Sequence, residues 1–309
     1  WEVVAQGKVI FRIDFDGKSE EEWRFSFLPE FEGIDWHLDD TRSWKEELNR
    51  QIEANASTLS DLVNDTLVFI EEICSRSDSL PLIYFSGGKE SIVTLELFKQ
   101  CGIKAQLLFA GTGMDFPEDE EFIKRFKLFI ETNPSYSELF SLHIEPGDPE
   151  RVQKLFERDG RLGIGNMWCR AELKYPIRNQ AVKKLYPKGV GIAFEGSRWY
   201  ETDFRRSHPR VNYVYDIQGY DKSQQVWAHA LADWNGFDIW TYIFKYDLKI
   251  NPLYHMGFQR TTCWSCPLVN PYHLQQSRKF NKEKWNEIEA YSVEGFKKDT
   301  QLSSLPTPF

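Results

Sequence analysis

The feature that most constrains this 309-residue chain is a short apolar run that leads into the segment YFSGGKES, residues 84–91. The run PLIYF (81–85) has the length and composition of a buried strand. After the two glycines, ESIVTLELFKQCG (90–102) carries apolar residues at helical spacing and ends at a glycine, a common helix stop. A strand, a glycine-rich loop and a helix in this order form a turn suited to binding phosphate groups.

Strand and helix patterns alternate after this turn. Apolar runs predict further strands at 104–110, 138–146 and 189–196, and intervening helices are predicted at 117–131, 149–158 and 171–186. This alternation predicts an α/β fold in which a parallel sheet has helices on both faces. Ligands of such sheets bind at the carboxyl ends of the strands, where residues 86–91 would lie.

The regions that flank the α/β segment have different patterns. In residues 1–43, two alternating runs (8–15 and 21–27) predict a β-hairpin in a small module, which residues before Trp1 would complete. A main domain is expected over 44–270, beginning with a helical segment from about Trp44 to Ser77. A polar, helical tail is expected over 271–309.

Composition and charge narrow the class of protein. The net charge of −9 argues against indiscriminate nucleic-acid binding, although it leaves room for a local basic patch. No apolar stretch approaches the roughly 20 residues that span a bilayer, and there is no secretory signal, so we expect a cytoplasmic protein without a membrane partner. The odd count of five cysteines favours thiols or metal ligands over a disulfide framework.

The residue types of the glycine-rich loop suit an anion. Gly87 and Gly88 allow backbone N–H groups to approach a phosphate closely, and Lys89 adds a positive charge. Ser86 and Ser91 add hydroxyl groups. The spacing differs from the Walker pattern, and a plain strand-to-helix turn would also explain the two glycines.

Several segments together resemble one known family. SGGKES (86–91) resembles the pyrophosphate-binding PP-loop of the adenine-nucleotide alpha-hydrolase superfamily, with Glu90 at a position usually held by aspartate. FAGTGMDFPED (109–119) resembles a segment of the phosphoadenosine phosphosulfate (PAPS) reductases: Thr112 and Gly113 match, whereas Gly111 replaces an aspartate. The resemblance implies an adenine nucleotide bound by residues 86–91, Thr112 and Gly113, and Glu90 could hold a magnesium ion.

The resemblance continues through the second half of the main domain. WCRAELKYPI (168–177), GSRWYETDFRR (196–206) and the segment that ends in CWSCP (263–267) are similar to family segments, in the family's order. The similarity covers residues ~78–270 and is greatest to archaeal PAPS-reductase-like proteins and the sulfur-transfer component of DNA phosphorothioation systems.

Three cysteines are candidate metal ligands. Cys263 and Cys266 form a CxxC pair in a predicted turn, a pattern typical of redox dithiols, zinc sites and iron–sulfur sites. The resemblance implies a [4Fe–4S] cluster held by this pair and a tandem cysteine pair, of which only Cys169 is present because Trp168 occupies the other position. The alternatives are a zinc or iron ion completed by a histidine such as His255 or His273, and thiols without a metal.

Basic residues near these motifs are candidates for substrate binding. Arg198 and Arg205 follow a predicted strand end, and arginine suits bidentate recognition of phosphate or sulfate. With Lys89, they are the predicted catalytic residues. Lys174 lies close to Cys169 in sequence and would hold a second anion. Solvated surface charge is the alternative for each arginine and for Lys174.

The resemblance leaves alternative functions open. The first is reduction of PAPS or adenylyl sulfate (APS) to sulfite, with electrons from a thioredoxin- or ferredoxin-like donor. The second is an ATP pyrophosphatase that adenylates a nucleic acid for sulfur insertion with the help of a sulfur donor. The nearly intact loop and the lack of a cysteine after Cys266 count against the first function, but the similarity over residues 168–267 is to the PAPS-reductase branch, so reduction is the expected function and ATP-dependent sulfur insertion the alternative. The third is a non-catalytic module that senses a nucleotide. The oligomeric state is a separate question, and a homo-oligomer is one alternative.

Overall fold

The computed structural model describes the backbone of residues 2–5, 8–14, 24–27, 44–188, 191–214 and 225–288, and side chains from residue 48 onward within most of these ranges. The chain separates into two units, Trp1–Arg50 and Gln51–Phe309. No described helix is both long enough and apolar enough to cross a membrane.

The first unit contains a small antiparallel sheet. Its strands are β1 (Glu2–Ala5), β2 (Lys8–Asp14) and β3 (Arg24–Phe27), in the order β1-β2-β3. The antiparallel pairing of β2 with β3 confirms the predicted hairpin, whereas β1 was not predicted. The residues between β2 and β3 lie outside the described part of the chain.

A six-stranded sheet forms the centre of the second unit. Its strands are β4 (Leu82–Tyr84), β5 (Ala105–Ala110), β6 (Phe140–Glu145), β7 (Ile192–Phe194), β8 (Val211–Val214) and β9 (Gln225–Ala228), in the order β6-β5-β4-β7-β9-β8. The first four lie within the predicted strands and are parallel to one another. They confirm the predicted parallel sheet, whereas β8, which the sequence did not predict, pairs antiparallel with β9. Neighbouring antiparallel strands need no crossover helix between them, which fits their separation of ten residues (215–224).

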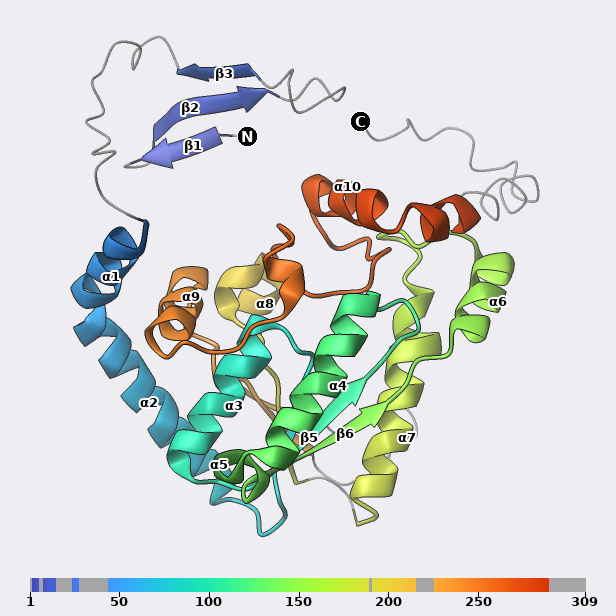
Figure 1. Ribbon diagram of the computed structural model, residues 1–309. Helices are drawn as coiled ribbons and strands as arrows, with labels where there is room; N and C mark the ends of the chain where they lie inside the picture. The colour runs from blue at the N-terminus through green and yellow to red at the C-terminus, as the bar shows by residue number, and fades with distance from the viewer. Residues whose placement is uncertain are drawn as a thin grey trace. The chain divides into compact units, whose positions relative to one another are not determined.

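Helices precede the sheet and connect its strands. Their bounds are α1 (Trp44–Ala54), α2 (Ala56–Cys74), α3 (Lys89–Cys101), α4 (Pro117–Thr132), α5 (Pro134–Ser137), α6 (Pro149–Asp159), α7 (Tyr175–Leu185), α8 (Asp203–Arg206), α9 (Gly236–Lys245) and α10 (Pro271–Phe280) (Figure 1). Short irregular helices are the π-helix η3 (Arg170–Lys174) and the 3₁₀-helices η4 (Trp199–Glu201) and η5 (Pro252–Tyr254). Residues 282–288 are also helical, so the part of the predicted tail that the structure describes is helical.

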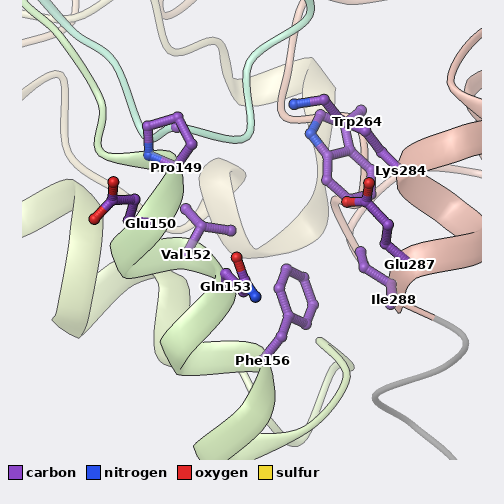
Figure 2. A pocket seen from close by; sticks show the side chains of 10 residues that line it. Pro149, Glu150, Val152, Gln153, Phe156, Trp264, Lys284, Glu287 and Ile288 are labelled. Atoms are coloured by element: carbon purple, nitrogen blue, oxygen red, sulfur yellow. The ribbon is translucent and has the colours of Figure 1, made fainter.

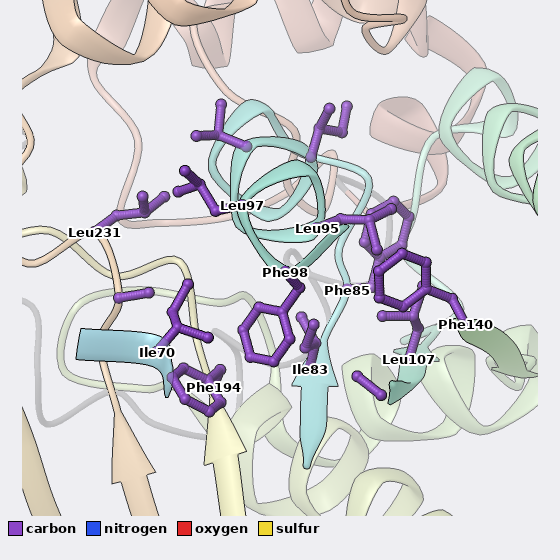
Figure 3. Close-up of a cluster of buried hydrophobic side chains, with 14 of the residues drawn as sticks. Ile70, Ile83, Phe85, Leu95, Leu97, Phe98, Leu107, Phe140, Phe194 and Leu231 are labelled. Atoms are coloured by element: carbon purple, nitrogen blue, oxygen red, sulfur yellow. The ribbon is translucent and has the colours of Figure 1, made fainter. Parts of the chain in front are cut away.

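Buried side chains cover both faces of the sheet. On one face, Phe98 of α3 lies over the strands and contacts Phe194 of β7 edge to face, with ring centroids 4.8 Å apart (Figure 3). Ile70 of α2 belongs to the same core. On the other face, Val182 of α7 packs with Leu82 of β4. The prediction of helices on both faces is therefore confirmed.

The loops that follow β5 and β6 cross at very short range. The amide of Gly111 donates to the carbonyl of Glu145 at 2.8 Å. A Cβ atom on Gly147 would lie 1.8 Å from the backbone nitrogen of Gly113. A Cβ atom on Gly111 would lie 2.8 Å from the backbone nitrogen of Gly147. This close approach explains why glycine stands at position 111, where the family segment has aspartate.

Candidate functional site

The glycine-rich loop joins β4 to α3, as the sequence predicts. Gly87 has a positive φ of 72°, and a Cβ atom there would lie 2.8 Å from Cδ1 of Ile123. Gly88 is the N-cap of α3 and provides no capping side chain. The first amides of a helix have no acceptor within the helix and favour negative charge, so this helix start is suited to an anion.

The loop serines have different surroundings. Ser86 is exposed, and its hydroxyl accepts a hydrogen bond from the Gly88 amide at 3.3 Å. Ser91 is buried, and its hydroxyl donates to the Gly88 carbonyl at 2.8 Å. Ser91 therefore supports the loop from beneath, whereas Ser86 remains accessible to a ligand.

One carboxylate joins two buried cations beside the loop. Oε1 of Glu90 lies 2.9 Å from Nζ of Lys89 and 2.9 Å from Nη2 of Arg198. Both cationic side chains are less than a tenth exposed. Burial alone would raise the pKa of Glu90, but Lys89 and Arg198 outweigh it and hold the pKa below its ordinary value. Glu90 therefore remains ionised in the folded protein until the pH falls through that lowered pKa.

The ion pairs extend from Arg198 to Arg205 through Glu201. Nη1 of Arg205 lies 2.9 Å from Oε2 of Glu201 and donates to the hydroxyl of Ser197. Nε of Arg198 lies 3.6 Å from the other oxygen of Glu201. Burial raises the pKa of Glu201, although Arg205 opposes this rise. The three predicted catalytic cations thus share one charge network, in which sequence reasoning did not include Glu201.

A segment just before the CxxC pair covers the loop; we call residues 252–261 the strap. The hydroxyl of Tyr254 accepts a hydrogen bond from the Lys89 amide at 2.9 Å. Nζ of Lys89 donates to the carbonyl of Gln259 at 3.3 Å. A Cβ atom on Gly88 would lie 2.8 Å from Oγ1 of Thr261. Sequence reasoning missed Tyr254, Gln259 and Thr261, because their contacts with the loop join residues more than 160 positions apart.

The segment after β5 contacts the cysteine pair. Oγ1 of Thr112 lies 3.2 Å from Sγ of Cys263, and the amide of Trp264 donates to the carbonyl of Met114 at 2.9 Å. The amide of Cys266 donates to the carbonyl of Cys263 at 3.1 Å, so both cysteines lie on one tight turn. Burial raises the pKa of the Cys263 thiol.

Cys169 and Lys174 lie in the same region. Cys169 immediately precedes the π-helix η3, which ends at Lys174. Burial and the neighbouring Cys266 raise the pKa of Cys169, whereas the ammonium of Lys174 lowers that of Cys263. Cys169 and Cys263 also pack against the same buried hydrophobic cluster, which places Cys169 near the CxxC pair. Such π-helical turns occur frequently at functional sites.

The candidate metal ligands predicted from the sequence are three cysteines and two histidines. Among the described residues, no three His, Cys, Asp or Glu side chains lie close enough together to hold one ion. His255 is exposed, and His273 is buried against Phe258, with ring centroids 5.0 Å apart.

A small cavity lies behind the cysteine turn. Its volume is about 190 Å³, and its wall includes Gly113, Val152 and Phe156 of α6, the ring of Trp264, and Ile288 (Figure 2). Glutamate and lysine side chains at its edge give it a mixed lining. The cavity separates α6 from the helical segment 282–288 beside Trp264.

Two buried carboxyl groups lie between the phosphate loop and the cysteines. Oδ2 of Asp115 accepts hydrogen bonds from the amide and hydroxyl of Thr112, at 2.6 and 3.1 Å. Oδ1 of Asp119 accepts from Nδ2 of Asn251 at 2.6 Å. Burial raises the pKa of both, and together with the nearby Asp115 it raises that of Asp119 to about 8.

Replacing Asp119 with asparagine is expected to reduce the pH dependence of stability. The folded state retains a proton on Asp119 that the unfolded chain releases above its ordinary pKa of 3.8, so stability falls as the pH rises from about 4 to about 8. The free energy of unfolding of Asp119→Asn, relative to wild type, should therefore increase over this range, as measured by urea unfolding. Asp203→Asn is the control, because that side chain is fully exposed. A constant difference for Asp119→Asn would contradict the raised pKa.

Comparison with known proteins gives one matching family. Residues 81–269 match the sequence profile of the family described as "Phosphoadenosine phosphosulfate reductase domain". This range contains the phosphate loop, the arginine-containing loop after β7 and all three candidate metal-binding cysteines.

Individual relatives are distant. An uncharacterized protein of Methanocaldococcus jannaschii is 25% identical over 225 residues, which cover 72% of this chain and 50% of that protein. An adenosine 5′-phosphosulfate reductase of Geobacillus thermodenitrificans is 27% identical over 198 residues, covering 62% of this chain and 76% of the enzyme. The chain spans about half the length of the archaeal relatives it matches.

Solved structures share the fold. The FMN adenylyltransferase of Candida glabrata, in complex with FMN and an ATP analogue, has a TM-score of 0.50 at 18% identity. The match covers 70% of this chain and 67% of that protein. The α/β fold with a mostly parallel sheet is thus common to this chain and adenine-nucleotide alpha-hydrolase structures.

Proposed function

Because the chain belongs to the phosphoadenosine phosphosulfate reductase domain family, we propose that it binds an adenine nucleotide at the β4–α3 loop and uses it in reductive sulfur chemistry. One observation carries this proposal: the phosphate loop and the cysteine pair lie within one site. Thr261 lies against Gly88 of the loop and precedes Cys263 by only two residues. A nucleotide held at the loop would therefore present its attached group near the cysteines.

Different residues of the site would bind different parts of the nucleotide. The amides at the start of α3 and the ammonium of Lys89 would hold a phosphate group. Arg198 and Arg205, after β7, would hold a sulfate or second phosphate group, since a guanidinium offers paired N–H donors. Lys174 would add positive charge near the cysteines. Cys263 itself is half-buried, beside Thr112.

The reaction we propose is reduction of PAPS or APS to sulfite. The bond between the sulfate sulfur and the phosphate oxygen breaks, and the nucleotide leaves as adenosine 3′,5′-bisphosphate or AMP. The sulfur accepts two electrons, which a thioredoxin- or ferredoxin-like donor supplies. Cys169, Cys263 and Cys266 would hold a [4Fe–4S] cluster, and such a cluster supplies one-electron redox capacity when bound. We place this chemistry in the cytoplasm.

ATP-dependent sulfur insertion into a nucleic acid is the second candidate. The nearly intact SGGKES loop favours it, because two glycines, the lysine and the helix start provide room and charge for a leaving pyrophosphate. Glu90 lies at this helix start and could bind a magnesium ion that accompanies the nucleotide. In this reaction ATP would adenylate the acceptor, and a sulfur donor would then replace the adenylate.

Cysteine replacement tests the sulfur chemistry. After anaerobic purification, Cys263→Ser is expected to lose at least about tenfold in both bound iron and sulfite release from APS or PAPS, because a hydroxyl is a poorer ligand for iron than a thiolate. Cys101→Ser is the control, since Cys101 lies in α3 and burial raises its pKa to about 11. Full iron content and sulfite release by Cys263→Ser would contradict the assignment. Release of AMP and pyrophosphate from ATP, without sulfite from either sulfonucleotide, would favour the second candidate.

A further inference from the structure

The anion-binding position at the start of α3 is filled by groups of the protein itself. Gly88 caps the helix without a side chain, and the acceptor for the Lys89 amide is the hydroxyl of Tyr254. The carboxylate of Glu90 accepts from its own amide and pairs with Lys89 and Arg198. A phosphate group that bound to these amides would therefore replace a hydroxyl contact as well as a carboxylate contact.

The strap holds the phosphate loop through groups that bind phosphate. Tyr254 contacts the Lys89 amide, and the Gln259 carbonyl accepts from Nζ of Lys89. Tyr254 and Thr261 lie against the same point of the loop, because a Cβ atom on Gly88 would lie 3.6 Å from the Tyr254 hydroxyl and 2.8 Å from Oγ1 of Thr261. The strap therefore uses both the backbone and the side chain of Lys89, so it competes with a phosphate for the same donors.

The strap also leads directly into the cysteine turn. Cys263 follows Thr261 by two residues, a separation of at most about 7 Å along the chain. Gly257, in the middle of the strap, has a positive φ of 85°. Beyond Cys263, the turn is anchored by the hydrogen bond from Trp264 to Met114. A displacement of the strap from the loop therefore acts on a short, anchored segment that carries Cys263 and Cys266.

We propose that Tyr254 is a positioning residue whose hydroxyl is displaced from the Lys89 amide by a bound phosphate group, and that the strap transmits this displacement to the cysteine turn. The inference rests on phosphate binding at the loop, the first part of the proposed function. It adds that occupancy of the loop changes the surroundings of Cys263 and Cys266.

Removing the Tyr254 hydroxyl shows whether it competes with a bound phosphate group or supports the structure of the loop. In Tyr254→Phe the Lys89 amide has lost its internal acceptor, so pyrophosphate should bind about fivefold more tightly, the equivalent of one ordinary hydrogen bond. A tyrosine that merely supported the loop would instead weaken binding when replaced. Calorimetric titration of the full chain with pyrophosphate distinguishes the two.

Hydrogen exchange detects the coupling in the wild-type protein. Saturating pyrophosphate should accelerate amide exchange at least about threefold in peptides covering 252–266, because the strap loses its contacts with the loop. Peptides from α7 are the internal control, since this helix lies on the other face of the sheet. In Tyr254→Phe, these strap peptides should exchange rapidly even without pyrophosphate.

Pyrophosphate titration and hydrogen exchange together distinguish a failure of the strap coupling from a failure of nucleotide binding at the loop. If pyrophosphate binds to the wild type but exchange over 252–266 stays unchanged, the coupling is wrong and nucleotide binding at the loop is unaffected. If Tyr254→Phe binds pyrophosphate more weakly than wild type, the competing role of the hydroxyl is wrong. If pyrophosphate does not bind to the wild type, the proposed function fails and this inference fails with it.

Discussion

Replacing Lys89 with alanine is expected to weaken adenine-nucleotide binding by about 10- to 100-fold, as is typical when a charge-assisted hydrogen bond of about 1.5–3 kcal/mol is removed. Lys89 is the first residue of α3, and its side chain is only 9% exposed. Its loss also leaves the carboxylate of Glu90 opposed by Arg198 alone, so the site becomes less positive where the phosphate would bind.

Calorimetric titration of both proteins with nucleotide measures this effect. Lys99→Ala is a matched control on the same helix, because Lys99 pairs with Glu96 in the last turns of α3. Its nucleotide affinity should equal that of wild type. Equal affinity of Lys89→Ala and wild type would place the nucleotide elsewhere and contradict the loop assignment.

Replacing Gly147 with alanine is expected to lower the free energy of unfolding by about 3 kcal/mol, at the upper end for overpacked sites. The added Cβ atom would lie 1.8 Å from the backbone nitrogen of Gly113 and 2.5 Å from its Cα atom. Neither neighbour is a flexible side chain, so the two loops must separate. This separation would also move Thr112, which contacts Cys263.

Urea unfolding of Gly147→Ala compares this loss with a glycine in open space. Gly165→Ala is the control, because no atom lies within 4 Å of a Cβ atom built there. That variant should stay within about 0.5 kcal/mol of wild type. A loss of less than about 1 kcal/mol for Gly147→Ala would show that the crossing loops relax at low cost.

The phosphate loop could be predicted from sequence because its information is local. The apolar strand, the two glycines and the helix pattern all lie within residues 81–102 and determine the turn. The strands β5, β6 and β7 were predictable for the same reason, as each is a short apolar run between helices. The strand β8 lies at the edge of the sheet with β9 next to it, and neither has such an uninterrupted apolar run, so their sequences do not stand out.

The contacts that complete the site could not be predicted in this way. Glu90 pairs with Arg198, which is 108 residues away, and Tyr254 contacts Lys89 across 165 residues. Sequence motifs marked Glu90 and Arg198 separately, each as a ligand-binding residue. Only the fold reveals that the two neutralise each other in this structure. Tyr254 carried no signal, because a tyrosine hydroxyl at a helix start follows no local spacing.

The measurement that tests the central claim most directly is equilibrium binding of APS, PAPS and ATP, each titrated separately into the anaerobically purified protein and then competed with pyrophosphate. The account predicts saturable binding of at least one nucleotide at a single site, and displacement of that nucleotide by pyrophosphate. Binding that pyrophosphate cannot displace, or no binding of any of the three, would contradict a nucleotide site at the loop between β4 and α3.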